Sequence, residues 1–239
     1  MQVIISKNYR ELSKKARDII INEIKKNPKS NIAFATGKTP KLVYKELIRA
    51  NKKKLVDFSK IKAFNLDEYY PIKKSSKQSY NYYLFKNLFN HINIKTSNIY
   101  LLNGKAKAPK KECENYEKLL KKNPIDLMIL GVGTNGHIAF NEPSSSYNSK
   151  TRLVNLNKET LKRNSKYFKG INKVPAKALT IGIKNILAAK KILLLASGKE
   201  KVVPIKHLIK GKISKEFPLT YLKKHKSLIV IIDKEAAGI

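Results

Sequence analysis

The residues best suited to chemistry lie in one short segment, Gly131–Pro143, which reads GVGTNGHIAFNEP. Within eight positions the segment supplies an amide, an imidazole and a carboxylate, at Asn135, His137 and Glu142. An imidazole gains and loses a proton near neutral pH, and a carboxylate or amide beside it can orient the ring. The segment therefore predicts a proton-transfer site centred on His137. The alternative is a histidine with a structural role in a buried loop.

Two adjacent acids, Asp67 and Glu68, follow the apolar segment 61–66. Acids are scarce in this chain, with 17 Asp and Glu against 51 Lys and Arg. A carboxylate at the end of a strand could act as a general base. Adjacent carboxylates on a loop are also commonly solvated, so the residues alone leave both interpretations open.

A third segment, Thr36–Pro40, combines a glycine with the start of a helix. We expect Thr39 to be the N-cap and Pro40 to occupy the first turn. Backbone N–H groups and the helix dipole make such a turn suitable for an anion, although a plain strand–helix connection is the other interpretation. A nucleotide P-loop is not indicated, because Ile32 stands where its first glycine is required. The candidate phosphate-binding residues here are Thr36, Gly37, Lys38 and Thr39.

The glycines at positions 131, 133 and 136 match the Gly-x-Gly-x-x-Gly pattern of dinucleotide sites. The match is weak, because it lies in the middle of the chain and Pro143 and several serines follow it where that fold needs its first helix. No His-x-His or Glu-x-x-His pattern accompanies the histidine, so a metal site is not indicated either. We therefore expect no cofactor and no metal.

The elements that must position these residues alternate between strands and helices. We expect strands at 3–6, 31–36, 61–66, 98–102, 125–131, 178–183, 192–196 and 228–232, and helices at 8–27, 40–52, 79–91, 110–122 and 199–210. A long irregular segment should run from the end of the 125–131 strand to about residue 175. This alternation predicts an α/β fold, a three-layer α/β/α sandwich with a mostly parallel, Rossmann-like sheet, in a single domain over 1–239. Loops at the carboxyl ends of parallel strands are where such folds build sites.

The net charge of +34 is the most extreme feature of the composition. Only five of the cations are arginine, which favours base readout and phosphate forks, and the lysines are spread along the whole chain. Abundant Lys, Asn and Ile are typical of an AT-rich genome, so we expect no specific nucleic-acid partner. A role in attracting a phosphorylated substrate is the alternative.

Three further features bear on location. No stretch approaches ~18 consecutive apolar residues, the length that a membrane-spanning helix needs. The first residues lack the architecture of a signal peptide. The single cysteine, Cys113, excludes an intrachain disulfide and fits a reducing compartment. We expect a cytoplasmic protein that does not associate with membranes.

Three blocks of the sequence together resemble the glucosamine-6-phosphate deaminase family. They are Ala35–Pro40 (ATGKTP), Phe64–Tyr69 (FNLDEY) and Gly131–Pro143. Weaker similarity extends over nearly the whole chain. The resemblance implies an isomerising deaminase of amino-sugar catabolism, which converts glucosamine 6-phosphate and water to fructose 6-phosphate and ammonia without a metal or cofactor.

The resemblance also implies catalytic roles. His137 would open the sugar ring by moving a proton between the ring oxygen and the anomeric hydroxyl, while Glu142 orients it. Asn135 would assist, at a position where some members carry Asp. Asp67 would move a proton from C2 to C1 through an enolamine, and water would hydrolyse the resulting ketimine.

For the phosphate, the resemblance implies contacts from the 36–39 turn and from Lys201, which stands at the position of a family lysine. Lys166 lies where some members place an arginine. A lysine is a point charge and not a planar fork, so Arg163 is an alternative for this contact.

Two other protein classes share this sheet type. A 6-phosphogluconolactonase-like hydrolase has a similar glycine–histidine motif, but that family lacks the Phe-Asn-Glu-Pro that follows His137 here. A non-catalytic phosphosugar-sensing domain usually loses the acids, whereas this chain keeps Asp67 and Glu142. Release of ammonia from glucosamine 6-phosphate distinguishes these classes.

Regulated members of the family are hexamers with a second phosphate site that uses a serine, an arginine and a lysine. Ser145 and Arg152 match the first two, but Val154 stands at the lysine position. We therefore expect a non-allosteric enzyme that is a monomer or a small homo-oligomer.

Overall fold

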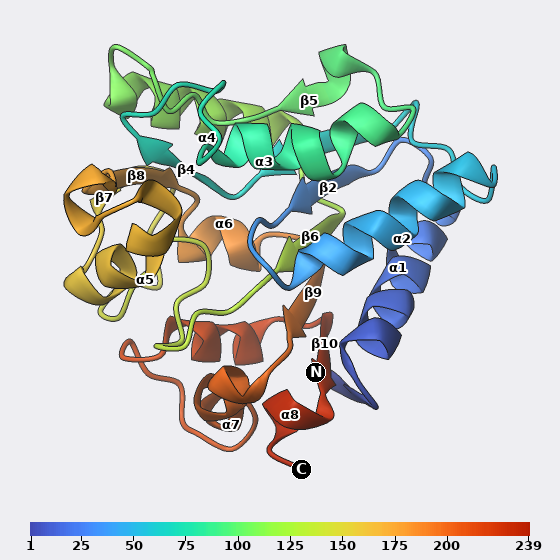
Figure 1. The fold of residues 1–239 in the computed structure, drawn as a ribbon. Helices are drawn as coiled ribbons and strands as arrows, with labels where there is room; N and C mark the ends of the chain where they lie inside the picture. The colour runs from blue at the N-terminus through green and yellow to red at the C-terminus, as the bar shows by residue number, and fades with distance from the viewer.

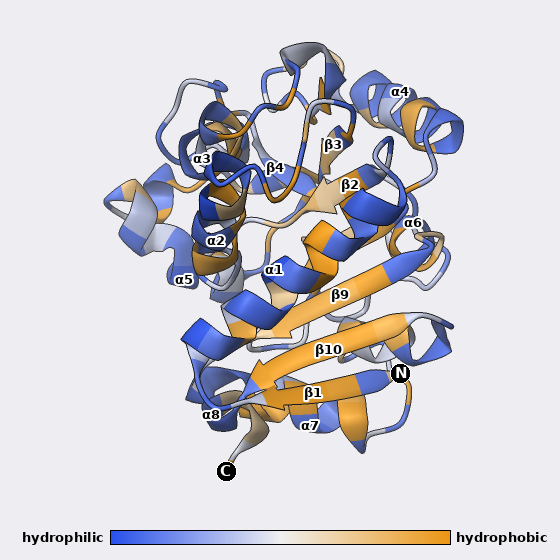
Figure 2. Cartoon of the chain, turned by 90° about the vertical axis from the view of Figure 1, so that its right-hand side faces the viewer, coloured by the Kyte–Doolittle hydropathy of each residue, from blue (hydrophilic) through white to orange (hydrophobic).

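A parallel sheet of seven strands forms the centre of the molecule. The computed structural model describes all residues, Met1–Ile239. The strands are β1 (Gln2–Ser6), β2 (Asn31–Phe34), β3 (Lys62–Asn65), β5 (Ile99–Tyr100), β6 (Leu127–Leu130), β9 (Lys191–Ala196) and β10 (Leu228–Asp233). They lie in the order β1-β10-β9-β6-β2-β3-β5, and every neighbouring pair is parallel. Their apolar runs are typical of strands that are covered on both faces, as the hydropathy of β9 and β10 illustrates (Figure 2).

Helices cover both faces of this sheet. They are α1 (Tyr9–Lys26), α2 (Pro40–Lys52), α3 (Tyr80–Asn87), α4 (Pro109–Lys122), α5 (Lys158–Phe168), α6 (Ile183–Leu187), α7 (Val202–Ile209) and α8 (Lys234–Ala237). Figure 1 shows α1 and α2 on one side of the sheet, and α6 and α7 on the other. The expected three-layer α/β/α sandwich with a parallel sheet is thereby confirmed.

The sequence did not predict a second, antiparallel sheet of three strands, which are β4 (Asp67–Tyr70), β7 (Arg152–Asn155) and β8 (Lys177–Thr180). We expected a loop at β4 and irregular chain over β7 and α5, and both expectations were wrong. The strand expected at 178–183 exists as β8, but it pairs with β4 and β7 and not with the main sheet. A small aromatic cluster around Tyr69 and Phe140 packs on this second sheet. Strands of four residues are stabilised by such pairing and packing, which a local pattern does not reveal.

The order of the main sheet creates a switch point between β2 and β6. From β2 the chain runs outward through β3 to β5, returns to β6, and then continues on the other side through β9 and β10. Ligands bind to open α/β sheets at the carboxyl ends of the strands where the order reverses. The turn after β2 and the loop after β6 are therefore neighbours at this position.

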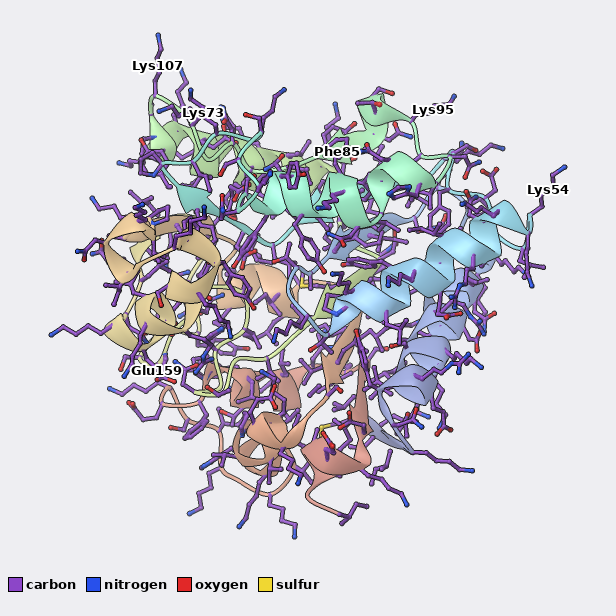
Figure 3. All side chains as sticks on the ribbon, in the orientation of Figure 1. Lys54, Lys73, Phe85, Lys95, Lys107 and Glu159 are labelled. Atoms are coloured by element: carbon purple, nitrogen blue, oxygen red, sulfur yellow. The ribbon has the colours of Figure 1, made fainter.

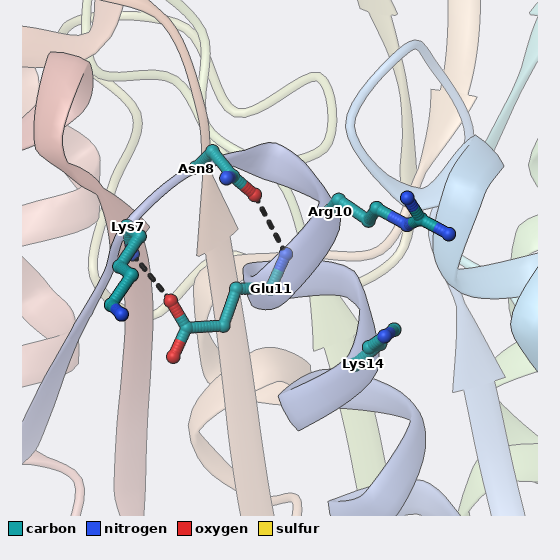
Figure 4. Close-up of a pocket in the computed structure, with 5 residues that line it drawn as sticks. All are labelled: Lys7, Asn8, Arg10, Glu11 and Lys14. Carbon is teal, nitrogen blue, oxygen red and sulfur yellow. Dashed lines mark hydrogen bonds between the residues drawn. The ribbon is translucent and has the colours of Figure 1, made fainter.

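The first turn of α1 is held by two hydrogen bonds between side chains and backbone N–H groups. The Asn8 side chain accepts a hydrogen bond from the Glu11 N–H at 3.0 Å, and Glu11 accepts one from the Lys7 N–H at 2.6 Å (Figure 4). Capping of this kind satisfies N–H groups that the helix itself cannot. It fixes the start of α1, and hence Tyr9, next to the turn that follows β2.

Lysine side chains extend from most of the surface. Lys54, Lys73, Lys95 and Lys107 point away from the body of the molecule in Figure 3. None of the helices combines the length and the apolar character needed to cross a membrane.

Candidate active site

The loop after β6 is folded around the ring of His137. The Gly133 N–H donates to the carbonyl of His137 at 2.9 Å, which closes the loop on itself. A Cβ atom at Gly133 would lie 2.2 Å from Cε1 of His137, so only glycine fits there. Gly136 has a φ of +79°, which other residues rarely adopt. These two glycines serve the packing and the turn of the loop.

His137, Asn135 and Glu142 form a continuous set of contacts. Nδ1 of His137 lies 2.7 Å from Oδ1 of Asn135 and 3.6 Å from Oε2 of Glu142. The Asn135 amide nitrogen donates to Oε2 of Glu142 at 3.0 Å. In this arrangement Oδ1 of Asn135 is an acceptor, so Nδ1 of His137 is the donor. The neutral ring then carries its lone pair on Nε2, which can accept a proton.

The carboxylate of Glu142 also receives two donors from the start of α5. Asn157 donates to Oε2 at 2.9 Å, and the hydroxyl of Thr160 donates to Oε1 at 2.5 Å. Burial by itself would raise the pKa of Glu142, but His137 and the donors Thr160 and Asn135 outweigh it and lower the pKa. Glu142 is therefore held in its charged form.

Sequence reasoning missed Asn157 and Thr160. The Asn157 side chain also accepts the Thr160 N–H at 2.8 Å and caps α5. An Asn followed by a helix-forming stretch is a recognisable N-cap signal, and it could have located the start of this helix.

Asp67 is the first residue of β4 and is only 7% exposed. Its carboxylate makes no hydrogen bond to another group of the protein, so both oxygens are available to a ligand. Burial, followed by the charge of neighbouring Glu68, raises the pKa of Asp67 well above its ordinary range. A carboxyl group with these properties can take up and release a proton under mild conditions.

Glu68 follows Asp67 directly in the chain, but its carboxylate is surrounded by hydrogen-bond donors. It is fully buried and accepts hydrogen bonds from the Ser79 hydroxyl, the Tyr80 N–H and the Asn81 N–H at 2.6 to 2.9 Å. It thereby joins β4 to the start of α3. The interpretation of Asp67 and Glu68 as a solvated loop pair is wrong, since both are buried.

Thr180 connects Asp67 to the loop after β6. It is the antiparallel partner of Asp67 in β8, and its hydroxyl accepts the Phe140 N–H at 3.1 Å. The Asn141 side chain donates to the next carbonyl of the same segment, that of Ile181, at 2.9 Å. The second sheet thus places Asp67 beside the loop that carries His137.

The turn after β2 has unsatisfied donors. The backbone N–H groups of residues 36–39 make no hydrogen bond within the protein. Gly37 has a φ of +103° and nothing lies within 4 Å of its ideal Cβ, so its backbone conformation, not space, calls for glycine. Thr39 occupies the N-cap position as expected, but its side chain does not cap the helix. An anion could satisfy these donors.

Cations gather near this turn. The side chain of Lys201 is only 14% exposed, and burial lowers its pKa against the opposing charge of Glu200. The positive charges of Arg163 and Lys38 lower the pKa of Lys201 further, so both cations act on Lys201. Lys166 is exposed and its ammonium lies 5.3 Å from the ring centre of Tyr167.

A family model described as glucosamine-6-phosphate isomerases/6-phosphogluconolactonase matches residues 6–230. The chain belongs to this family. The resemblance seen in the three sequence blocks is confirmed.

Relatives in the family align along the full chain. Glucosamine-6-phosphate deaminases of Clostridium novyi (strain NT) and Thermoanaerobacter sp. (strain X514) are each 48% identical over 100% of this chain, and 99% and 95% of their own lengths are covered. A solved structure of a monomeric glucosamine-6-phosphate deaminase superposes with a TM-score of 0.97 at 41% identity, covering 100% of this chain and 99% of the other. The 6-phosphogluconolactonase of Trypanosoma cruzi superposes with a TM-score of 0.81 at 20% identity, covering 99% and 96%, and shares the fold.

Ser145 and Arg152, the residues expected at a second phosphate site from the resemblance to glucosamine-6-phosphate deaminases, lie close to Glu142, and the Ser145 N–H donates to the Glu142 carbonyl at 3.0 Å. Arg152 donates to Asn141 at 2.9 Å and to the Ser145 hydroxyl at 3.4 Å. Val154 is half-buried and packs against the small aromatic cluster. No group of three or more His, Cys, Asp or Glu side chains is arranged as metal ligands.

Proposed function

We propose that this protein is an isomerising deaminase that converts glucosamine 6-phosphate and water to fructose 6-phosphate and ammonia. The family and the deaminases that align along the full chain support this reaction class. The observation that carries the proposal is Asp67, a buried carboxyl group without a protein hydrogen bond, which Thr180 links to the loop that carries His137. Isomerisation needs an acid–base group for carbon in addition to one for oxygen, and we assign these roles to Asp67 and His137.

The first step is opening of the sugar ring. Nε2 of His137 takes the proton of the anomeric hydroxyl and delivers a proton to the ring oxygen, so that the C1–O5 bond breaks. Glu142, ionised and linked to Nδ1 through Asn135, stabilises the transient positive charge on the imidazole. The open chain presents an aldehyde at C1 and the amine at C2.

The second step uses Asp67. Its carboxylate removes the proton from C2 while the C1 oxygen takes a proton from the ammonium group on C2, which gives an enolamine, and Asp67 then returns its proton to C1. The product is a ketimine at C2, to which water adds before ammonia leaves. The raised pKa of Asp67 suits a group that must both accept and donate this proton.

For the phosphate we propose the N–H groups of residues 36–39 together with Lys201 and Arg163. Arg163 is preferred to Lys166, because its charge acts on Lys201 while the Lys166 ammonium lies over Tyr167. Arg163→Ala should raise KM more than Lys166→Ala, and steady-state kinetics of the two variants compare them. The opposite order would assign the contact to Lys166.

The decisive test is ammonia release by the purified protein from glucosamine 6-phosphate, with fructose 6-phosphate measured in parallel. The rival is lactone hydrolysis, because the family also includes 6-phosphogluconolactonases and that reaction needs water activation only. We expect ammonia and fructose 6-phosphate in equal amounts, and no acceleration of 6-phosphogluconolactone hydrolysis. Lactone hydrolysis without ammonia release would reverse the assignment.

We also propose that residues 1–239 act as one catalytic domain, located in the cytoplasm and active as a monomer or small homo-oligomer. The aligned solved structure is described as monomeric, which supports this state. Light scattering of the purified protein measures it directly, and a hexamer would contradict the proposal.

A further inference from the structure

Tyrosine hydroxyls are hydrogen-bonded to the backbone carbonyl oxygens of the turn after β2. The Tyr83 hydroxyl donates to the Gly37 carbonyl at 2.6 Å. The Tyr9 hydroxyl lies 2.9 Å from the carbonyl oxygens of both Lys38 and Thr39. Tyr44 donates to the carbonyl of Ala35. The three tyrosines come from three different helices, α3, α1 and α2.

Each of these bonds also fixes an N–H group. In a trans peptide the C=O of one residue and the N–H of the next belong to the same plane and point in opposite directions. A tyrosine that holds the Gly37 carbonyl on one side therefore aims the Lys38 N–H to the other side. By the same geometry, Tyr9 on the Lys38 carbonyl sets the Thr39 N–H.

The N–H groups so directed belong to the unsatisfied set of residues 36–39. The turn therefore has two unlike sides, with carbonyl oxygens bound to tyrosines on one and free donors on the other. Free N–H groups that converge on one side of a turn form a site for an anion.

Tyr9 has a second function at the same place. Its hydroxyl accepts the N–H of Leu42 at 3.0 Å, a donor in the first turn of α2 that the helix cannot satisfy. This contact replaces the cap that Thr39 does not provide. The orientation of α2 and that of the turn are thus held by one hydroxyl.

The hydroxyls remain donors over the whole working range of pH. Burial raises the pKa of Tyr9, and it raises the pKa of Tyr44 and Tyr83 far above the ordinary value. A tyrosine that stays protonated keeps its O–H for the carbonyl it holds.

We propose that Tyr9, Tyr44 and Tyr83 are positioning residues that aim the backbone N–H groups of the turn at the phosphate of the substrate. This inference rests on the proposed function, because it assumes that the turn binds that phosphate. The tyrosines do not touch the ligand and act through the peptide groups they hold.

The test is Tyr83→Phe, which removes one hydroxyl from a partly exposed side chain and leaves the ring. The matched control is Tyr82→Phe, the adjacent residue on α3, whose hydroxyl makes no hydrogen bond in the structure. One neutral hydrogen bond corresponds to about 3- to 10-fold in affinity. We expect Tyr83→Phe to raise both KM and the competitive inhibition constant of inorganic phosphate by about this factor, with kcat unchanged.

A second variant, Tyr9→Phe, should weaken phosphate inhibition similarly and also lower Tm, because α2 loses a capping contact. A purely structural role for Tyr83 would reduce kcat or stability without a selective change in phosphate inhibition, and that result would overturn the proposal. Equal inhibition constants in Tyr83→Phe and Tyr82→Phe would do the same.

Failure of the positioning role can be distinguished from failure of the proposed deaminase function. If the wild-type protein releases no ammonia, the reaction assignment fails, but titration with inorganic phosphate can still be followed by NMR at the Lys38 and Thr39 amides. Phosphate-induced shifts that weaken in Tyr83→Phe but not in Tyr82→Phe support the positioning role. Equal shifts in both variants, or no shifts in the wild type, contradict it.

Discussion

Asp67 is buried and Glu142 is largely buried in the candidate site, yet their surroundings push their pKa values in opposite directions. Asp67 has no hydrogen-bond donor and a second acid beside it, and its pKa is raised. Glu142 has donors from Asn135, Asn157 and Thr160 and contacts His137, and its pKa is lowered. Burial raises the pKa of both, so the donors and charged groups around each carboxylate decide the direction of its shift.

This difference suits Asp67 and Glu142 to two different roles. A carboxyl group whose charged form is poorly stabilised exchanges its proton readily, which suits transfer between carbon atoms. A carboxylate surrounded by donors keeps its charge, which suits the support of an imidazolium. Pairs of titratable groups whose environments diverge in this way commonly mark an acid–base assignment.

The largest expected effect is on Asp67. Asp67→Asn should reduce kcat/KM by about 10³-fold or more, near or beyond the upper part of the range for general acid–base groups, because no neighbouring side chain can replace it. Exchange of the substrate C2 proton with solvent should disappear, as measured by NMR in deuterated water. Retention of this exchange in the variant would rule out the carbon acid–base role.

The next largest effect should distinguish the two carboxylates directly. Glu142→Gln and His137→Gln should each reduce turnover by about 10²-fold or more, through ring opening. A substrate already in open-chain form should partly rescue both variants, but not Asp67→Asn. Equal failure of all three on such a substrate would contradict the division of duties.

A smaller effect should follow from removing one donor to Glu142. Thr160→Val should reduce kcat/KM by about 10-fold at neutral pH, since a hydrogen bond to a charged group contributes about 1.5–3 kcal/mol and only part of it acts in the transition state. The pKa of Glu142 should rise towards its ordinary value, so activity should be lost at higher pH than in the wild type as the solution is acidified. The pH profile of kcat/KM measures this shift.

Ser165→Ala is the matched control on the same helix, because the Ser165 hydroxyl donates only to the Lys162 carbonyl. The acidic limb of its pH profile of kcat/KM should coincide with that of the wild type. A shift of equal size in both variants would show that α5, and not the donor to Glu142, is responsible.

The smallest expected effects are on thermal stability, where Asp67→Asn and Glu142→Gln should change Tm in opposite directions. The folded pKa of Asp67 lies above the unfolded value, so its contribution to stability is present at low pH and is lost as pH rises above about 4. Asp67→Asn should therefore raise Tm at neutral pH by about 2–4 °C. The folded pKa of Glu142 lies below the unfolded value, so its contribution is present at neutral pH and is lost on acidification, and Glu142→Gln should lower Tm by about 3–8 °C.

Thermal unfolding at several pH values checks both signs. The two variants should approach the wild-type Tm in acid, where the carboxyl groups are protonated in folded and unfolded states alike. Changes of the same sign at neutral pH would mean that burial, and not the surrounding donors, dominates both sites.

The main sheet was predictable because most of its strands lie in local apolar segments. The segments 125–131 and 228–232 were recognised in this way, and their boundaries agree with β6 and β10 to within about two residues. β4 was not predictable, because Asp-Glu-Tyr-Tyr has no apolar run and its pairing partner lies far along the chain. The core of the second sheet is likewise assembled from distant segments.

The candidate site shows the same division between local and distant information. Asn135, His137 and Glu142 lie in one loop, so their spacing revealed them. Asn157 and Thr160 reach Glu142 only after α5 has folded back over the loop, and the tyrosines reach the turn after β2 from separate helices. Their roles depend on tertiary structure, which the pattern of residues does not contain.

The pairing of Asp67 with Thr180 has a consequence for the order of assembly. The two residues are separated by more than a hundred positions, so closing this contact costs chain entropy and comes late in folding. The turn after β2 and the three tyrosines bound to its carbonyl groups all lie within residues 9–87. During synthesis, which proceeds from the N-terminus, the turn after β2 can form while Asp67 still lacks its sheet partner.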